Sequence, residues 1–338
     1  MQRGLTLGKF APLHRGHQWL IETALDEVDE LIVVIYDCPE TTSVPLNVRA
    51  GWVRRLYPTV RVVEAWDGPM EVGYTPEIMH RHEQYMINLL GGTTIDKFFS
   101  SERYGEHMAK ALGAQNRLVD SARIEIPISG TRVRQCPFEN RDFVCATVYQ
   151  DLITRAVFLG GPGTGKTTLA QTVARRMNTK WMPEYGREYW EKNQIDRRLS
   201  PSQLGDLAEG HLQREDALAL EANRIIFVDT NALTTLAFSY QYHGFALPTL
   251  EALADHAQAR YDIVFVCDTD IPYEDTWDRS GIINREIMQK RTLAQLHTRR
   301  IPYVMLKGNV EERTATVVNV MRRFRKYSNY TASSFGIS

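Results

Sequence analysis

The stretch Gly160-Gly161-Pro162-Gly163-Thr164-Gly165-Lys166-Thr167 decides the fold of the second half of the chain. It fits the pattern G-x-x-x-x-G-K-[ST], follows the apolar run 156–159 and opens a helical pattern, the context this motif requires. Successive backbone N–H groups of such a loop point at phosphate oxygens, and the helix start adds its positive end. We expect Lys166 to reach the β- and γ-phosphates of ATP and Thr167 to hold Mg²⁺. The predicted nucleotide-binding residues are Gly160, Gly161, Pro162, Gly163, Thr164, Gly165, Lys166, Thr167 and Thr168.

Around this loop, short apolar runs alternate with longer amphipathic stretches, which is typical of a parallel sheet flanked by helices. The strands that we predict after the loop's own strand are 225–228, 263–267 and 303–306. The predicted helices are 166–177, 201–222, 231–242, 284–298 and 310–325.

Three charged residues favour a kinase as the function of this half of the chain, because a phosphate loop alone does not identify the reaction. Asp229 ends the apolar run 225–228 and can hold Mg²⁺ through water. Glu184 and Arg187 lie about one helix beyond the loop, where an acceptor hydroxyl would enter. Glu184 is our candidate base or positioning carboxylate, and Arg187 could neutralise charge on the moving phosphoryl group.

A polar loop near residue 279 is the last candidate of this half. It contains Asp275 and Arg279 and precedes Arg285 and Arg291 on a predicted helix. We interpret it as a lid that brings Arg279 to the nucleotide. For Arg285 and Arg291, an ordinary solvated helix face and a functional role are both open.

The first half carries two motifs more than a hundred residues apart. Gly8-Lys9-Phe10-Ala11-Pro12-Leu13-His14-Arg15-Gly16-His17 follows the predicted strand 4–7, and the i, i+3 spacing of His14 and His17 places both on one helix face. Ile128-Ser129-Gly130-Thr131-Arg132-Val133-Arg134 offers a second helix start, with Ser129 as N-cap. A metal site is the competing interpretation, but the glutamate of H-E-x-x-H is missing. The other strands predicted here are 31–36, 60–65, 97–100 and 117–119, with helices 16–28, 46–57, 76–90 and 104–112.

Taken together, these two motifs resemble those of the HxGH nucleotidyltransferase superfamily. The resemblance implies that a substrate phosphate attacks the α-phosphorus of ATP and releases pyrophosphate, with no covalent enzyme intermediate. It implies that His17 stabilises the transition state, that His14 contacts phosphates and that Lys9 assists at the polyphosphate. The β/γ end would be held by Ser129, Thr131 and Arg134. The ATP-binding residues so implied are Gly8, Lys9, Phe10, His14, His17, Ser129, Thr131 and Arg134.

The order of the two halves resembles the NadR-type bifunctional proteins of NAD salvage. The resemblance extends to Phe99-Ser100-Ser101-Glu102, to Glu184-Tyr185-Gly186-Arg187-Glu188 and to Asp229-Thr230-Asn231 with Thr234 and Thr235. It implies a Rossmann-like nicotinamide-mononucleotide adenylyltransferase followed by a P-loop ribosylnicotinamide kinase. The substrates would be nicotinamide riboside, nicotinamide mononucleotide and ATP, and NAD the final product. We expect catalytic roles for His17, Lys166, Glu184, Arg187 and Asp229.

The domain limits that we predict are 1–136 for the nucleotidyltransferase, 137–154 for a connector, 155–327 for the kinase and 328–338 for a tail. Because the first strand begins near Gly4, we expect no room for the helix-turn-helix repressor domain of some family members. The sequence therefore predicts no DNA binding by that route. The charge balance agrees, since 40 Lys and Arg face 41 Asp and Glu, a net charge of −1.

Composition points to a cytoplasmic enzyme without a membrane partner. No apolar run approaches the roughly 20 residues of a membrane span, and no signal peptide opens the chain. The four cysteines form no C-x-x-C pair, so we expect free thiols: Cys38, Cys136, Cys145 and Cys267.

Some alternatives stay open at this point. A related fusion could act on another nucleoside or phosphate acceptor, or the chain could sense nucleotides without turnover. A homo-oligomer is compatible with the sequence. The aromatic partner of the nicotinamide ring is unassigned, although core packing is the more common role of the candidates Trp52, Trp66, Tyr74, Trp181 and Tyr185.

Overall fold

The computed structural model describes residues 1–195, 198–272 and 281–327, without the side chains of 281–283. The chain divides into two compact units. The first, here called the front domain, comprises Met1–Tyr149 and the described residues from Arg325 onward. The second, the back domain, comprises Gln150–Phe324. The predicted limits of the connector stay predictions, and the predicted tail 328–338 lies outside the described residues.

The front domain is built on a five-stranded parallel sheet of order β3-β2-β1-β4-β5. Its strands are β1 (Arg3–Gly8), β2 (Glu30–Tyr36), β3 (Arg61–Ala65), β4 (Lys97–Ser100) and β5 (Gln115–Leu118). Its helices are α1 (Arg15–Glu27), α2 (Leu46–Leu56), α3 (Pro76–Leu90), α4 (Tyr104–Leu112) and α5 (Gly130–Gln135). Right-handed crossovers place α1 and α2 on one face of the sheet and α3 and α4 on the other, where Met86 and Met108 pack with Leu5.

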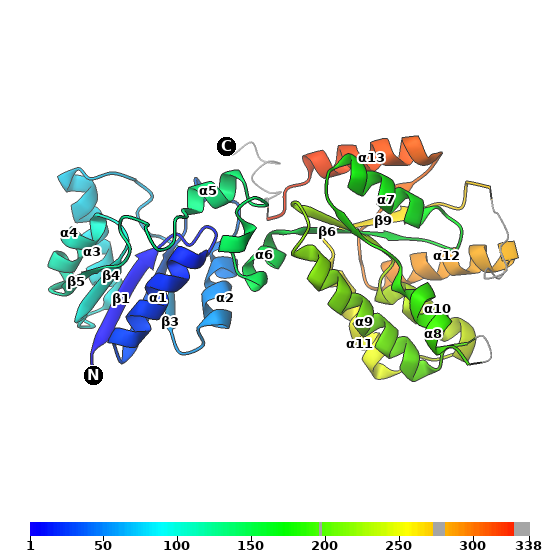
Figure 1. Cartoon of the computed structure of the whole chain (residues 1–338), viewed down its shortest axis with the longest axis horizontal. Coiled ribbons are helices and arrows are strands. Elements are labelled where there is room, and N and C mark those ends of the chain that lie inside the picture. Colours follow the sequence, from blue (N-terminus) through cyan, green and yellow to red (C-terminus); the bar gives the residue numbers. More distant parts are fainter. Residues whose placement is uncertain (196–197, 273–280, 328–338) are drawn as a thin grey trace. The chain divides into compact units, whose positions relative to one another are not determined.

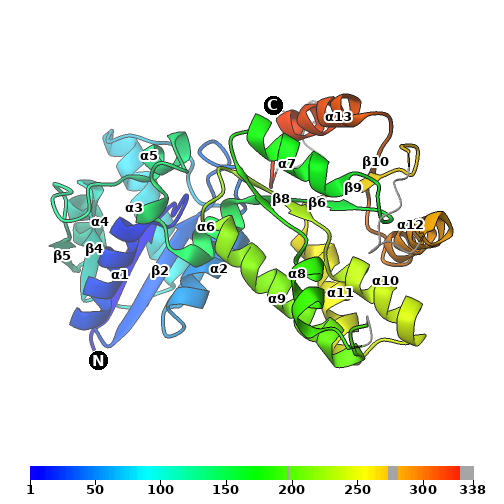
Figure 2. The same ribbon diagram turned by 45° about the vertical axis from the view of Figure 1, so that its right-hand side comes forward.

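The back domain also has a parallel sheet, of order β10-β9-β6-β8-β7. Its strands are β6 (Thr154–Leu159), β7 (Lys180–Met182), β8 (Ile225–Asp229), β9 (Ile263–Cys267) and β10 (Val304–Leu306). Helices α7 (Lys166–Arg176) and α13 (Val310–Arg323) cover one face (Figures 1 and 2). The other face carries α8 (Tyr185–Asn193), α9 (Pro201–Ala219), α10 (Ala232–His243), α11 (Pro248–Arg260) and α12 (Gly281–Thr298). The phosphate loop follows the carboxyl end of the central strand β6. Open parallel sheets bind their ligands at the carboxyl ends of their strands.

Two parallel sheets flanked by helices confirm the predicted fold class. Several elements were not predicted: β7, the short α6 (Ala146–Leu152), α8 and α11. β7 has only three residues, too few for a strand pattern. α11 turns little more than Leu250, Ala254 and Ala257 inward, so small alanines replace the large apolar stripe that marks a helix in sequence.

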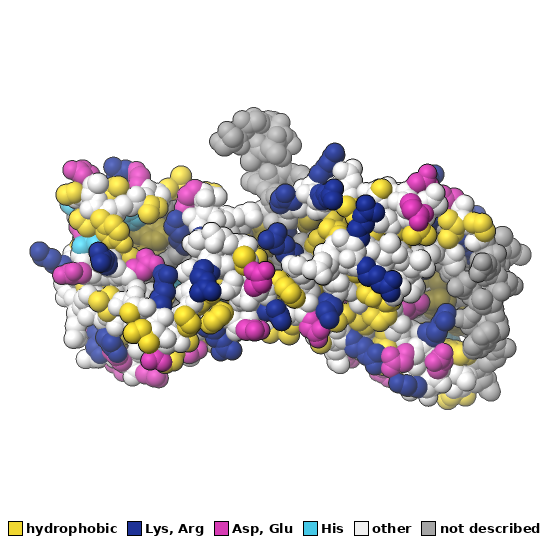
Figure 3. Space-filling model, turned by 45° about the horizontal axis from the view of Figure 1, so that its top comes forward, with side chains coloured by type: hydrophobic (Ala, Val, Ile, Leu, Met, Phe, Trp, Pro, Cys, Tyr) yellow, Lys and Arg dark blue, Asp and Glu magenta, His cyan; other side chains and the backbone are white. Residues whose placement is uncertain are grey.

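No helix within the described part of the chain is both long and apolar enough to cross a membrane. Basic and acidic side chains are interspersed over the face shown in Figure 3, as the net charge of −1 suggests.

Candidate active sites

The phosphate loop of the back domain takes a shape that only glycine permits. Gly160 has φ +136° and Gly165 has φ +79°, backbone conformations that L side chains rarely adopt. A Cβ on Gly160 would also lie 2.6 Å from the carbonyl oxygen of Cys267. The glycines of the motif therefore let the loop pass close under the end of β9 before α7 begins.

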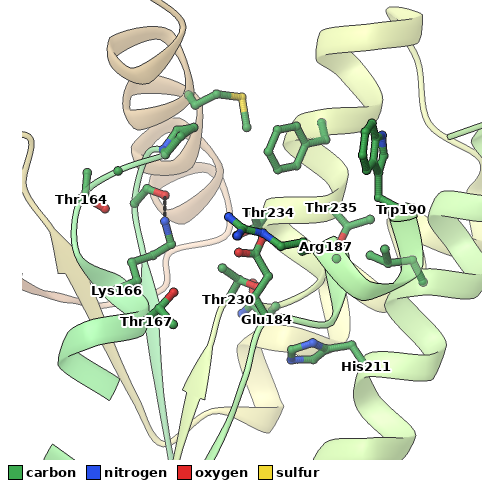
Figure 4. A pocket seen from close by; sticks show the side chains of 18 of the residues that line it. Thr164, Lys166, Thr167, Glu184, Arg187, Trp190, His211, Thr230, Thr234 and Thr235 are labelled. Carbon is green, nitrogen blue, oxygen red and sulfur yellow. Dashed lines mark hydrogen bonds between the residues drawn. The ribbon is translucent and has the colours of Figure 1, made fainter. Parts of the chain in front are cut away.

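Within this loop Lys166 is held by backbone oxygens. Its Nζ donates to the carbonyls of Gly160 at 3.0 Å and Gly161 at 2.9 Å, and Figure 4 shows the ammonium folded over the loop. The amide of Gly161 donates to Oε1 of Gln289 at 2.7 Å. Carbonyl dipoles thus keep the ammonium at the mouth of the cradle, where phosphate oxygens would be stronger partners.

Asp229 is a buried carboxylate of the back domain with a raised pKa. It is fully buried at the end of β8, and its Oδ2 accepts a hydrogen bond from Thr167 Oγ1 at 2.5 Å. Burial, and then the negative charge of Glu184, raise the pKa of Asp229 to about 6. Its Oδ1 is buried without a hydrogen-bond partner among the described residues. A hydroxyl and a buried oxygen in need of a partner fit Mg²⁺, which takes few protein ligands beside substrate phosphates.

A cavity of about 500 Å³ begins at the phosphate loop and continues beyond it. Glu184, Arg187 and Thr230 lie opposite Lys166 and Thr167 in Figure 4. Six large apolar or aromatic side chains, here called the apolar slot, also line the cavity: Trp190, Leu199, Leu204, Leu207, Phe238 and Tyr242. One continuous space therefore joins the predicted phosphate, carboxylate and guanidinium groups to an apolar slot.

The slot contains residues that sequence reasoning missed. Trp190 lies three residues after Arg187 on α8, and Phe238 and Tyr242 are four residues apart on α10. The available signal was that these residues follow the quoted motifs at helical spacing, on the same helices as Arg187 and Thr234. His211, on α9, also lines the cavity and was not considered.

The aromatic candidates in the back domain lie elsewhere. Trp181 packs against the core cluster of the sheet. Tyr185 lies beneath the guanidinium of Arg214, 3.8 Å from the ring centroid. Arg285 is 2% exposed and donates to the carbonyl of Ile271 at 3.0 Å, so a solvated helix face is wrong for it. The predicted lid residues Asp275 and Arg279 lie outside the described residues.

In the front domain, His14 and His17 cap the start of α1 reciprocally. His14 Nδ1 accepts from the amide of Gly16 at 3.2 Å, and His17 Nδ1 accepts from the amide of His14 at 3.3 Å. The two rings stack with centroids 3.8 Å apart. Since both Nδ1 atoms accept, the proton of each neutral ring resides on Nε2, which is left to donate to a ligand.

Both histidines are uncharged near neutral pH. Burial, helped by the positive charges of Arg123 and Arg134, lowers the pKa of His14 to about 4. Burial also lowers the pKa of His17 well below its usual range, with His14 and Arg123 contributing. Arg123, which forms an ion pair with Glu102 at 3.4 Å, is thus a cation near this site that the sequence did not single out.

The two predicted motifs of the front domain come together in space. Arg134 Nη1 donates to the carbonyl of Ala11 at 2.5 Å, and its Nη2 donates to Thr131 Oγ1 at 3.1 Å. Ser129 caps α5 by accepting from the amide of Arg132, as predicted. Lys9, in contrast, is paired with Glu40 at 2.6 Å.

The remaining predicted residues of the front domain differ in exposure. Phe10 is buried, with its ring centroid 4.8 Å from that of His17. Gly8 ends β1. Trp52 is fully buried in the core, whereas Trp66 and Tyr74 are exposed.

Two buried arginines, Arg49 and Arg313, were not anticipated. Arg49 donates to the carbonyls of Lys9 at 2.5 Å and Tyr36 at 2.8 Å. Arg313 donates to the carbonyls of Thr164 at 2.7 Å and Asp268 at 3.1 Å. Each ties a predicted phosphate-binding loop to the end of the neighbouring strand.

Comparison with known proteins finds a separate family match in each half of the chain. Residues 5–136 match a family described as cytidylyltransferase-like, and residues 155–313 match a family described as AAA domain. The trifunctional NAD biosynthesis/regulator protein NadR of Salmonella typhimurium is 28% identical over 329 residues, which cover 90% of this chain and 78% of the relative.

Two solved structures of NadR proteins share the fold. One, in complex with NAD and AMP-PNP, aligns with a TM-score of 0.56 at 22% identity over 95% of both chains. The other, in complex with NR, aligns with a TM-score of 0.57 at 22% identity over 96% of both chains. The chain is therefore similar to the NadR proteins over nine-tenths of its length, with a cytidylyltransferase-like match in its first half and an AAA-domain match in its second.

Proposed function

We propose that this protein is a bifunctional enzyme of NAD salvage. The back domain transfers the γ-phosphoryl group of ATP to the 5′-hydroxyl of nicotinamide riboside, giving nicotinamide mononucleotide and ADP. The front domain then lets the phosphate of that mononucleotide attack the α-phosphorus of a second ATP, giving NAD and pyrophosphate. The relatives named NadR and the NR and NAD in two related structures support this choice of substrates.

The observation that carries the kinase proposal is the continuity of one cavity. The phosphate loop and the apolar slot of Trp190 lie in the same space of about 500 Å³, with Glu184 and Arg187 between them. A nucleoside whose ring occupies the slot would present its 5′-hydroxyl to Glu184 and to the end of the triphosphate. Phosphoryl transfer needs this alignment and charge stabilisation more than covalent help.

In this arrangement each group has one task. Glu184 accepts the proton of the 5′-hydroxyl as its oxygen bonds to the γ-phosphorus. Lys166 leaves the loop carbonyls for the β- and γ-phosphates, and Arg187 neutralises charge on the transferred group. Thr167 and Asp229 would hold Mg²⁺, which supplies positive charge to the phosphates. Free cysteines in the described chain are compatible with a reducing cytoplasm, where we place the enzyme.

In the front domain the chemistry needs no proton transfer, because the attacking phosphate is already ionised. As the bond between the α-phosphorus and its bridging oxygen breaks, charge builds on the α-phosphoryl group and on pyrophosphate. We propose that the Nε2–H of His17 donates to the α-phosphoryl group and that the Nε2–H of His14 donates to the polyphosphate. Neutral imidazoles suit this task, since both of their Nδ1 atoms are engaged by backbone amides.

The test is incubation of the protein with nicotinamide riboside, ATP and Mg²⁺, followed by chromatography of all nucleotides. We expect mononucleotide and ADP first, then NAD and pyrophosphate. Phosphorylation of deoxynucleosides but not of nicotinamide riboside would contradict the proposed acceptor. Tight binding of ATP or NAD without any turnover would identify a nucleotide sensor instead.

A further inference from the structure

Three buried polar side chains line the same cavity as Glu184, and the proposed mechanism gives none of them a task. His211 is 5% exposed, Asn231 3% and Thr234 9%, and all three line the cavity. Nε2 of His211, Nδ2 of Asn231 and Oγ1 of Thr234 have no hydrogen-bond partner within the described part of the chain. A buried polar atom left unpaired destabilises the fold, so such a cluster indicates that a ligand supplies the partners.

Asn231 and Thr234 lie at the start of α10. Asn231 is the N-cap of α10, and its Oδ1 accepts from the amide of Leu233 at 3.0 Å. This bond leaves Nδ2 as a pure donor. Thr234 lies on the first turn of the same helix.

His211 lies close to a charged network. It lies one helical turn before Glu215, which is fully buried and accepts from the hydroxyl of Tyr261 at 2.7 Å. Arg155 and Arg260 also bind Glu215. The end of α9 is therefore rigidly held, and burial lowers the pKa of His211, so that its ring is neutral. A neutral imidazole Nε2 can donate or accept, as a hydroxyl can.

The position of these three residues in the cavity indicates which part of the ligand they would contact. In Figure 4 Thr234 lies in the central part of the view with Glu184 and Arg187, His211 lies below Glu184, and Trp190 lies at the upper right. A nucleoside with its 5′-hydroxyl at Glu184 and its ring near Trp190 has its sugar between them. One donor and two groups able to donate or accept match the two secondary hydroxyls of a ribose.

We propose that His211, Asn231 and Thr234 form a subsite for the 2′- and 3′-hydroxyls of the acceptor, so that the back domain selects ribonucleosides over deoxyribonucleosides. This inference rests on the proposed kinase function and adds the selection of the sugar. A site built around hydroxyls discriminates against analogues that lack them, because its own buried groups then stay unpaired. We expect the wild-type protein to prefer a riboside to its 2′- or 3′-deoxy analogue by at least about tenfold in kcat/KM.

The test compares kcat/KM for nicotinamide riboside with that for its 2′-deoxy and 3′-deoxy analogues in wild type, Thr234→Val, Asn231→Asp and His211→Phe. Thr234→Val keeps the shape of the side chain, and Asn231→Asp keeps the oxygen that caps α10. Each variant should lower kcat/KM for the riboside about five- to fiftyfold and reduce its preference over one deoxy analogue. The KM for ATP should stay within about twofold.

The matched control is Thr314→Val. Thr314 also has a buried hydroxyl without a partner among the described residues, but it lies on α13 and does not line the cavity. Its replacement should leave sugar selectivity unchanged. Should His211→Phe fail to fold, as judged by loss of ATP binding, the two milder variants still decide the matter.

Three results would overturn the proposal. One is equal use of riboside and deoxyriboside by the wild-type protein. The second is an equal loss for all sugars in the variants. The third is an unchanged kcat/KM for the riboside in all three variants. If nicotinamide riboside is not a substrate, the same comparison with adenosine, uridine and their deoxy analogues tests the subsite separately from the proposed function.

Discussion

The two domains share no sequence motif, yet in each of them one buried arginine holds the predicted phosphate-binding loop. In the front domain Arg49 takes the carbonyl of Lys9, and in the back domain Arg313 takes the carbonyl of Thr164. Each arginine also donates to a carbonyl and a carboxylate at or just beyond the end of the neighbouring strand. These belong to Tyr36 and Asp37 in the front domain and to Asp268 and Asp270 in the back domain.

This similarity shows that the carbonyl oxygens of such a loop need hydrogen-bond donors from the rest of the fold. A loop that turns its amide hydrogens toward an anion must place its carbonyl oxygens elsewhere, and a buried carbonyl needs a donor. The five fixed donors of a guanidinium can serve several carbonyls at once. The two loops differ on the side that would face a ligand, where one offers neutral histidines and the other a lysine among glycines.

The largest expected effect tests whether the two loops work independently. Lys166→Ala should lower kcat/KM for riboside phosphorylation by at least about 10³-fold and leave adenylylation of the mononucleotide within about twofold. His17→Ala should do the reverse, with a loss of about 10²- to 10³-fold. Separate assays of the two half-reactions measure this, with Lys192→Ala as a surface control. Loss of both activities in either variant would contradict two independent sites.

The buried arginines should give the next largest effect. Arg49→Lys and Arg313→Lys leave carbonyls unpaired, so each should reduce the free energy of unfolding of its own domain by about 2–3 kcal/mol. Each should also raise the KM for ATP in that domain only. Denaturant titrations followed by the two activities report on each domain. Arg54→Lys, at an exposed pair with Glu64, should change stability by less than about 0.5 kcal/mol. An unchanged KM for ATP in both lysine variants would show that the arginines do not support the loops.

The neutral histidines should make the front domain sensitive to acid. The pKa of His14 falls from 6.5 to about 4 on folding, so the unfolded chain binds more protons between these pH values. Stability should therefore decrease by up to about 3 kcal/mol as pH falls from 6.5 to 4, and His17 adds to the slope. Unfolding of wild type and His14→Asn, which keeps an N-cap acceptor, should show a shallower slope in the variant. Identical slopes would refute the assignment.

The smallest expected effect concerns the back domain. The pKa of Asp229 is about 6, so phosphorylation should weaken as pH falls through that value and the carboxylate is neutralised. Glu184→Gln removes a negative charge and should move the midpoint of kcat/KM to lower pH by on the order of half a unit, beside its loss of rate. Glu188→Gln, whose charge is paired with Lys192 and Arg214, is the control. A midpoint that stays unchanged in Glu184→Gln would show that the two carboxylates do not interact.

The sequence predicted most of the fold because the informative signals are local. The helix 76–90 and the strand 263–267 were predicted with the limits that the structure gives. The contact between Arg134 and the loop at Ala11 joins residues 123 positions apart, and only the family resemblance indicated it. The roles assigned to individual site residues stay predictions.

What the sequence could not indicate depends on tertiary packing. Arg49 and Arg313 look like solvated helix residues until their burial is known. His211 falls on the buried stripe of α9 with Leu204 and Leu207, where a core histidine is the ordinary interpretation. Its free ring nitrogen becomes informative only when the cavity beside it is known.

The reciprocal cap at the start of α1 has a consequence for how the front domain can react. A histidine that relays a proton takes it on one ring nitrogen and releases it from the other. In His14 and His17 the inner nitrogen is already engaged by a backbone amide, so relay would require the first turn of the helix to open. While the cap is intact the pair can donate hydrogen bonds but cannot relay a proton, so we expect this domain to act on nucleophiles that arrive already deprotonated.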